Sequence, residues 1–191
     1  WGRIGQVLGV QGDLCAFRFY DPNNRLWDPV TGGGAVLDLG VYVISMAQDF
    51  LGNARDVHCV GRYAPNGVES AATINVAYVG GGTAALTCGF DVHGPGRMTI
   101  FGTKGWVEIQ PRFHHPTTIS VHRSGVLPRI IEAKQIGRGY AHELMEVSDC
   151  LLAGQTQSAT MPLSDTVEVM RVLESCLKQL GRPQEEAKVE I

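Results

Sequence analysis

The chain has 191 residues, of which 44% are hydrophobic and 18% charged, and its formal net charge is −3 at pH 7. This balance is typical of an ordinary globular protein and excludes collagen-like, disordered and polybasic classes, so no nucleic-acid partner is expected. A chain of this length buries roughly 70% of its unfolded surface, enough for one substantial core. We therefore expect one domain over residues 1–183 and a charged, frayed tail over 184–191.

The five cysteines are widely spaced, odd in number and set in apolar runs. This pattern predicts buried thiols in a reducing, cytoplasmic compartment. The pair His114-His115 precedes Pro116, which favours a loop over a metal site. No apolar run approaches the roughly 20 residues that span a bilayer, so no membrane partner is expected. The chain begins at Trp1 rather than at a methionine, which is compatible with a fragment.

Two kinds of periodicity follow one another along the first two thirds of the chain. Residues 4–20 alternate between apolar and polar, which predicts a strand interrupted at Gly12-Asp13. Between Gly34 and Leu51 apolar residues recur at helical spacing and Gly52 follows, which predicts a helix. From 57 to about 134 the period is two, with glycine-rich turns at 80–82, 93–96 and 102–105. This stretch predicts five or six strands in one antiparallel meander.

Helical spacing returns after Gly139. Leu144, Val147 and Leu151 form the apolar stripe of one expected helix, which ends at Gly154. A second helix carries a stripe at Val167, Met170, Leu173, Leu177 and Leu180, with Ser164 as its expected N-cap and Gly181 after its end.

Grouped strands and grouped helices predict an α+β fold, a predominantly antiparallel open sheet with helices covering one face. The other face then needs a partner. The alternating positions of the strands carry too many large apolar side chains for the uncovered face to remain in water. These residues are Tyr78, Phe90, Val92, Phe101 and Trp106.

The first helix carries the residues best suited to chemistry. Asp38 and Tyr42 are four residues apart and so project from the same helical face, with Ser45 one turn further on. Gly40 lies between them and allows another group to approach closely. A carboxylate and a phenol are thus paired, although the same spacing also fits the polar side of an ordinary amphipathic helix.

A glycine triplet at 32–34 precedes this helix. Glycines at a helix N-terminus suit phosphate binding, but a dinucleotide site needs a GxGxxG motif within a βαβ unit. The sequence contains no such unit, so we expect no dinucleotide site in this chain.

These motifs together resemble a known family. The stretch 25–28 (RLWD), the glycine triplet with Ala35, and 38–42 (DLGVY) resemble the second domain of the glucose-fructose oxidoreductase / inositol dehydrogenase / MocA family. Further matches are 101–105 (FGTKG), Gly139-Tyr140 with Glu143, and 161–166 (MPLSDT), so the resemblance covers nearly the whole chain in order. Within this family the motif DLGxY, with its tyrosine, most resembles the dimeric dihydrodiol dehydrogenase branch. Many other members have histidine at that place.

The resemblance implies the C-terminal domain of a two-domain NAD(P)-dependent oxidoreductase. Its substrate would carry a CH–OH group, as in a sugar, polyol or dihydrodiol. The Rossmann half, with its GxGxxG motif and catalytic lysine, is absent from these 191 residues, so NAD or NADP is expected to be held mainly by that other domain. The resemblance also implies a homodimer formed through the open face of the sheet.

Residue roles follow from the same resemblance. Tyr42 is the candidate general acid/base for the substrate hydroxyl, and Asp38 would orient substrate or water. A free phenol has a pKa of about 10, so the family's lysine would supply the cationic neighbour. Arg25 and Tyr140 are candidates for lining the substrate pocket, with a surface ion pair and a packed phenol as alternatives. A non-catalytic dimerisation module or a small-molecule-binding module derived from the family remains an alternative to the enzyme.

Overall fold

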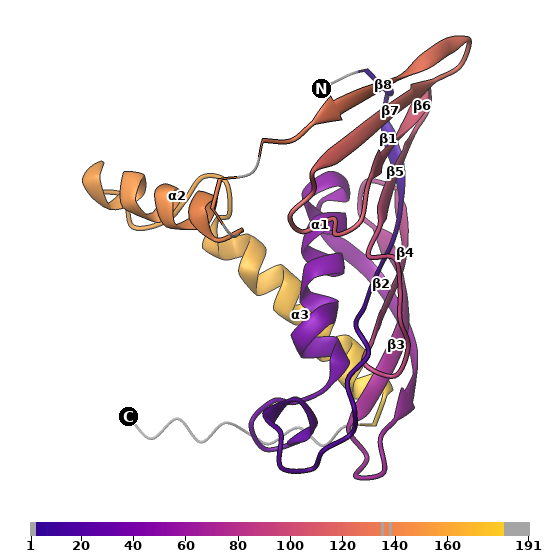
Figure 1. The fold of residues 1–191 in the computed structure, drawn as a ribbon, viewed down its shortest axis with the longest axis vertical. Coiled ribbons are helices and arrows are strands. Elements are labelled where there is room, and N and C mark those ends of the chain that lie inside the picture. Colours follow the sequence, from indigo (N-terminus) through magenta and orange to yellow (C-terminus); the bar gives the residue numbers. More distant parts are fainter. Residues whose placement is uncertain (1–2, 135, 138, 182–191) are drawn as a thin grey trace.

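A computed structural model describes residues 3–134, 136–137 and 139–181, so the expected tail at 184–191 lies outside the described residues. Strands form one open sheet, and helices lie against one of its faces (Figure 1). The strands are β1 (Val7–Cys15), β2 (Ala54–Tyr63), β3 (Glu69–Tyr78), β4 (Thr83–Gly89), β5 (Met98–Gly102), β6 (Gly105–Ile109), β7 (Thr118–Arg123) and β8 (Val126–Glu132).

The sheet has eight strands in the order β2-β3-β4-β1-β5-β6-β7-β8. Neighbouring strands are antiparallel except β1 and β4, which run parallel. The predicted α+β class and its predominantly antiparallel open sheet are therefore confirmed. Seven strands, rather than five or six, follow the first helix.

The position of β1 corrects one expected turn. Because β1 lies between β4 and β5, residues 93–96 connect two strands that are not neighbours and do not form a hairpin. The carboxylate of Asp13 in β1 accepts hydrogen bonds from the backbone N–H of Gly96 at 3.0 Å and of Arg97 at 3.3 Å. The connection is thus fixed to the strand that it passes.

The interruption predicted at Gly12-Asp13 is absent, since β1 continues through both residues. Gly12 occurs within the strand because the thioether of Met98, on the neighbouring β5, occupies the space that a Cβ would need. Glycine here allows close packing rather than a break in the strand.

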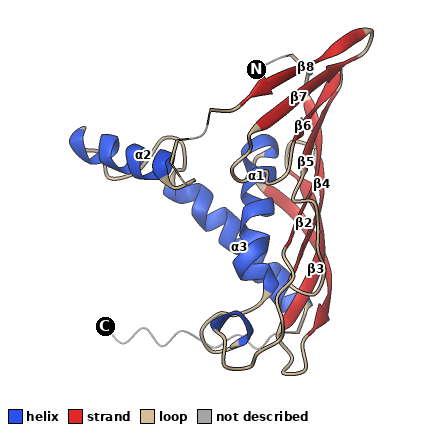
Figure 2. Cartoon of the chain, viewed as in Figure 1, coloured by secondary structure: helices blue, strands red, loops and turns tan. Residues whose placement is uncertain are grey.

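The helical elements are a 3-10 turn η1 (Arg25–Trp27), a π-helical turn η2 (Val36–Gly40), and the helices α1 (Val41–Leu51), α2 (Ala141–Leu152) and α3 (Leu163–Gln179). Helices α1 and α3 cover one face of the sheet, whereas α2 projects away from it (Figure 2). The predicted N-cap at Ser164 is wrong: Pro162 takes the cap position, and Ser164 lies in the first turn. Gly52 and Gly181 follow α1 and α3 with positive φ, as the sequence predicts.

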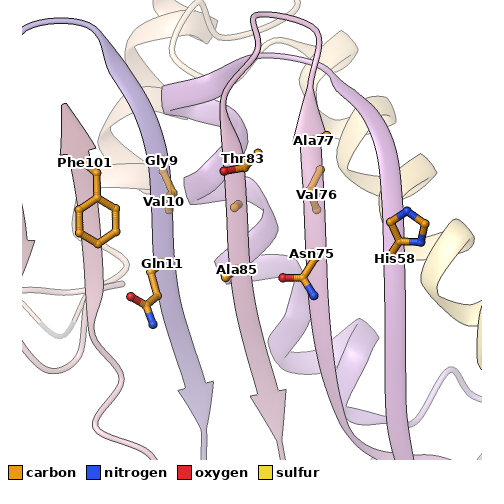
Figure 3. Close-up of a pocket in the computed structure, with 11 residues that line it drawn as sticks. Gly9, Val10, Gln11, His58, Asn75, Val76, Ala77, Thr83, Ala85 and Phe101 are labelled. Atoms are coloured by element: carbon orange, nitrogen blue, oxygen red, sulfur yellow. The ribbon is translucent and has the colours of Figure 1, made fainter. Parts of the chain in front are cut away.

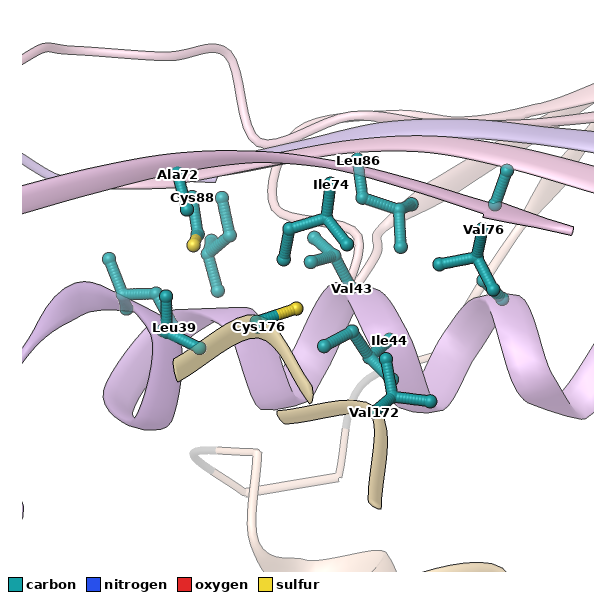
Figure 4. Packing of buried hydrophobic residues seen from close by; sticks show 14 of the residues in the cluster. Leu39, Val43, Ile44, Ala72, Ile74, Val76, Leu86, Cys88, Val172 and Cys176 are labelled. Atoms are coloured by element: carbon teal, nitrogen blue, oxygen red, sulfur yellow. The ribbon is translucent and has the colours of Figure 1, made fainter. Parts of the chain in front are cut away.

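The core lies between the sheet and these two helices (Figure 4). Val43 and Ile44 of α1 are fully buried and pack between the sheet and Val172 of α3. On the sheet side, Ile74 of β3 and Leu86 of β4 are fully buried as well. Each such side chain contributes about 1.5–3 kcal/mol by leaving water, which fixes α1 against the strands.

Two glutamines tie α3 to its neighbours. The Gln48 amide of α1 donates to the backbone carbonyl of Asp165 at 3.0 Å. The Gln179 side chain accepts from the backbone N–H of Cys59 and donates to the carbonyl of Val57, both at 2.9 Å. Strand β2 is an edge strand, so Gln179 satisfies backbone groups that would otherwise lack a strand partner.

The apolar stripes of the last two helices differ from expectation. Leu144, Val147 and Leu151 are exposed, and α2 buries none of its residues within the described structure. In α3 the predicted Leu173 is buried together with Val169, Val172 and Cys176, and Leu180 just after the helix is buried as well. The predicted Val167 and Met170 are about half exposed. The helices form where predicted, but their tertiary contacts differ.

The open face of the sheet is less apolar than predicted. Tyr78 and Phe90 are each 1% exposed because they point toward the helices, whereas Phe101 and Trp106 remain on the open side. Phe101 borders a shallow hollow of about 520 Å³ whose floor is made of small and polar side chains such as Ala85 (Figure 3). Val92 lies beyond the end of β4 and is partly exposed.

The prediction of buried thiols is confirmed for Cys59, Cys88 and Cys176, and Cys15 and Cys150 are half-buried. Burial raises the pKa of the Cys88 thiol to about 12. None of the helices formed by the described residues combines the length and apolar character that crossing a membrane requires.

Candidate functional site

The segment that leads into α1 is shaped by η1. Asn24 accepts a hydrogen bond from the backbone N–H of Leu26 at 3.0 Å and so caps the turn. Trp27 is buried, and its indole N–H donates to the carbonyl of Phe19 at 3.0 Å. This anchor presents Arg25, whose side chain is 74% exposed, toward the start of the next helix.

The glycine triplet folds back onto this turn. The N–H of Gly33 donates to the carbonyl of Asp28, and the N–H of Gly34 to that of Leu26, both at 2.8 Å. A Cβ on Gly33 would lie 2.6 Å from the carbonyl oxygen of Arg25, so only glycine fits. Because the N–H groups of Gly33 and Gly34 already bond to backbone carbonyls, neither is available to a pyrophosphate.

Asp38 lies in the π-helical turn η2, a local geometry that is frequent at functional sites. Its carboxylate pairs with the guanidinium of Arg25 at 3.2 Å. The Asp38 side chain is 26% exposed, so it is only partly covered by its neighbours. The structure thus brings together two residues that the sequence predicts for the site.

The close approach expected at Gly40 on the side of Asp38 and Tyr42 is not what the structure shows, because Gly40 is buried and faces the core, where a Cβ would make only ordinary contacts. A Cβ on Gly40 would lie 3.4 Å from the sulfur of Cys88 in β4 and 3.7 Å from Leu173 in α3. Gly40 therefore seats the turn that carries Asp38 against the sheet and α3.

Tyr42 lies one turn after Asp38, in the first turn of α1, and is 44% exposed. Its ring packs against the imidazole of His114, with the ring centroids 5.6 Å apart. His114 belongs to the loop between β6 and β7, which is anchored by buried Phe113 and by a 2.9 Å hydrogen bond from the Phe113 N–H to the carbonyl of Gly96. Sequence reasoning missed this neighbour, because the His114-His115 pair predicts only a loop.

Tyr140, the remaining predicted residue, takes the cap position before α2 and is 67% exposed. Its carbonyl accepts from the N–H of Leu144 at 3.1 Å. No contact within the described part of the chain joins Tyr140 to Asp38, Tyr42 or Arg25.

A cavity of about 500 Å³ opens beside His114, where the β6–β7 loop, the segment after β8 and the start of α2 come together. We call it the basic pocket and define it by five of its lining residues: Arg112, His114, His115, Lys134 and His142. Partial burial, followed by the charges of His115 and Arg112, holds the pKa of His114 below its usual range. Near neutral pH this imidazole is therefore mainly uncharged.

Among the described residues, no group of three or more His, Cys, Asp or Glu side chains is arranged to hold a metal ion. In the glycine triplet, the N–H groups of Gly33 and Gly34 are already bonded to backbone carbonyls. The ionisable groups near Tyr42 can instead bind a polar organic molecule and exchange a proton with it.

Comparison with known proteins places this arrangement in a family. The GFO/IDH/MocA C-terminal domain matches residues 1–108. The human trans-1,2-dihydrobenzene-1,2-diol dehydrogenase is 29% identical over 185 residues, which cover 91% of this chain and 55% of that protein. The chain thus spans about half the length of the curated relatives that it matches.

Solved structures agree with this match. The aldose-aldose oxidoreductase from Caulobacter crescentus, in complex with glycerol, superposes with a TM-score of 0.79 at 26% identity, covering 94% of this chain and 55% of that one. KijD10, a 3-ketoreductase from Actinomadura kijaniata in complex with NADP and TDP-benzene, shares the fold with a TM-score of 0.75 at 20% identity, covering 93% of this chain and 55% of that one. From its motifs, its fold and the match over more than half its length, the chain belongs to the GFO/IDH/MocA family as its C-terminal domain.

Proposed function

We propose that this chain is the substrate-binding and dimerisation domain of an NAD(P)-dependent oxidoreductase acting on a CH–OH group of a sugar, polyol or dihydrodiol-like substrate. The observation that supports the proposal is that Asp38, which pairs with Arg25, and Tyr42, which packs against His114 of the cavity lining, lie four residues apart in one helical segment. Family membership and the named activities of the relatives support it.

The proposed division of labour follows from what this chain contains. Hydride transfer is the chemistry of the nicotinamide cofactor, and no residue of this chain is assigned to it. The N–H groups of Gly33 and Gly34 are already bonded within this chain, which supports a Rossmann domain as the holder of the dinucleotide. That domain would account for the part of the relatives that this chain does not match.

Tyr42 would exchange the proton of the reacting hydroxyl, since its phenol is the accessible acid/base group nearest to Asp38 along the helix. Asp38 would accept a hydrogen bond from the substrate or from water. Arg25 would hold that carboxylate in place through the 3.2 Å ion pair. His114 is mainly neutral near pH 7, so the cation that a working phenol needs would come from outside this chain, as the family's lysine does.

Tyr140 would line the substrate pocket from the start of α2. Its neighbour Gly139 borders the basic pocket, and its exposed ring is free of core packing. The dimer would form through the open face of the sheet around Phe101 and Trp106, where two copies would pack sheet on sheet.

The test uses the full-length protein that carries this chain. It is mixed with NAD⁺ or NADP⁺ and a panel of sugars, polyols and dihydrodiols, and formation of the reduced cofactor is followed by absorbance. We expect turnover with at least one CH–OH compound. Binding of a panel compound without any cofactor reduction would contradict the enzyme and favour the small-molecule-binding module.

A second titration checks where the cofactor is held. The isolated chain, titrated with NADH or NADPH and followed by cofactor fluorescence, should show no saturable binding. Saturation at micromolar cofactor would place a nucleotide site in this chain and overturn the division of labour.

A further inference from the structure

The basic pocket has an unusual set of ionisable groups. Its five defining residues, Arg112, His114, His115, Lys134 and His142, are all of basic type and come from three separate segments. Glu132 and Glu143 are close by in sequence, but neither is among the residues that line the cavity. The lining therefore contains basic side chains and no acidic one.

The local electrostatics agree with this composition. The charges of His115 and Arg112 contribute to the lowered pKa of His114, because a positive surrounding opposes a further positive charge. Arg112 and Lys134 bring a guanidinium and an ammonium group to the lining. An oxyanion in the cavity would relieve the repulsion among these groups and gain charge-assisted hydrogen bonds.

The pocket also adjoins the proposed reaction centre. His114 lines the cavity and also packs against the ring of Tyr42, with 5.6 Å between the ring centroids. The loop that carries it is fixed by Phe113 and by a 2.9 Å hydrogen bond from the N–H of His115 to the carbonyl of Arg112. A molecule whose hydroxyl reaches Tyr42 can therefore extend a second group past His114 into the cavity.

We propose that the basic pocket binds an oxyanion group of the substrate, so that the substrate is a polyol or sugar that carries a phosphate or a carboxylate. This inference rests on the proposed function, because it assigns the substrate class of the same site. Arg112 and Lys134 supply the permanent charge, and the imidazoles donate hydrogen bonds.

A binding experiment tests the pocket independently of turnover. The full-length protein is titrated with inorganic phosphate and, separately, with a sugar acid, and heat is recorded by isothermal titration calorimetry. Arg112→Gln and Lys134→Gln should each weaken binding about 10-fold, the effect of losing one charged hydrogen bond. Arg112→Lys should restore most of the affinity, since it keeps the charge.

The matched control is Arg129→Gln. Arg129 is an exposed cation of β8 that does not line the cavity, so its loss should leave both affinities unchanged. Equal weakening by Arg129→Gln and Arg112→Gln would mean that only the general surface charge matters, and would overturn the proposal.

A kinetic experiment separates the two sources of the oxyanion. A neutral polyol, its phosphate ester and its carboxylate analogue are compared by kcat/KM, and the better of the two anions identifies the group that the pocket takes. Arg112→Gln should raise KM for that anion about 10-fold and leave kcat nearly unchanged, as expected for lost binding away from the reacting atoms.

The two proposals fail in different ways. Turnover of neutral and anionic substrates with equal kcat/KM, unaffected by Arg112→Gln, would overturn the oxyanion pocket and leave the oxidoreductase intact. Binding of phosphate or a sugar acid that depends on Arg112 and Lys134, in a protein without any turnover, would support the pocket and contradict the enzyme. Absence of anion binding in the calorimeter together with absence of an anion preference overturns the pocket in either case.

Discussion

The hydroxyl groups of Tyr78 and Tyr63 differ in whether they have a hydrogen-bond partner within the described residues. The hydroxyl of Tyr78 is buried without a hydrogen-bond partner in the part of the chain that the structure describes, and burial raises its pKa well above the ordinary value. The hydroxyl of Tyr63 donates to the carbonyl of Leu180 at 3.0 Å. A buried polar group without a partner destabilises the fold, whereas a paired one stabilises it.

The same substitution should therefore have opposite effects at the two positions. Tyr78→Phe removes the unpaired hydroxyl and should raise the free energy of unfolding by about 1 kcal/mol, while Tyr63→Phe should lower it by about 0.5–1.5 kcal/mol. Urea unfolding followed by circular dichroism measures both. A Tyr78→Phe variant less stable than Tyr63→Phe would contradict the absence of a partner for the buried hydroxyl.

At the residue scale the sequence predicts part of the site. The spacing of Asp38 and Tyr42 predicts a shared face from helical geometry alone, and the structure has Asp38 in the π-helical turn η2 and Tyr42 in α1 directly after it. For Arg25 the sequence leaves a surface ion pair as the alternative to a pocket role, and the structure shows such a pair with Asp38. The contact between Tyr42 and His114 was not predictable, because it depends on where the β6–β7 loop comes to lie.

Helices α1 and α2 differ in how far their apolar residues are buried. Ile44 of α1 is fully buried between the sheet and α3, whereas Leu151 of α2 is 70% exposed. Both helices show helical apolar spacing in the sequence, so periodicity alone does not distinguish them.

Alanine substitutions in α1 and α2 should therefore lower the stability of the chain by different amounts. Ile44→Ala leaves a cavity in the core and should cost about 2–5 kcal/mol, while Leu151→Ala should change the stability of the isolated chain by less than about 0.5 kcal/mol. Thermal and urea unfolding of the isolated chain test both values. A cost for Leu151→Ala equal to that for Ile44→Ala would show that α2 packs on this core in solution.

At the element scale the sequence predicts the type of most elements and misses how they pair. The alternation in β3 and β4 and the glycines between them predict a hairpin, which is a local arrangement. The insertion of β1 between β4 and β5 is long-range, and no local signal encodes it. The same insertion explains why the turn at 93–96 is not a hairpin.

The molecule as a whole has one covered and one open sheet face (Figure 1). The fold class follows from the order of strands and helices, but the direction in which Tyr78, Phe101 and Trp106 point follows from strand register, and Phe90 just after β4 is buried against Trp27. Register places Tyr78 in the core and Phe101 and Trp106 on the open face, where the proposed dimer would form.

We expect the chain to sediment near twice its mass of 20.6 kDa at tens of micromolar concentration. Phe101→Asp puts a charge in the proposed interface in both copies and should shift the protein to the monomer. Val30→Asp, at a position 75% exposed in the loop before α1, is the control and should leave the dimer intact. A wild-type monomer in analytical ultracentrifugation would contradict the interface.

The central claim is that this domain supplies the group that exchanges the proton of the substrate hydroxyl. Turnover of the full-length protein by wild type, Tyr42→Phe and the control Tyr63→Phe tests it most directly, with folding of each variant verified by circular dichroism. Tyr42→Phe keeps the ring against His114 and removes the transferable proton, so kcat should fall by about 10²–10⁴. Tyr63→Phe should leave kcat unchanged. Near-wild-type kcat in Tyr42→Phe would contradict the assignment and move the proton transfer to another group.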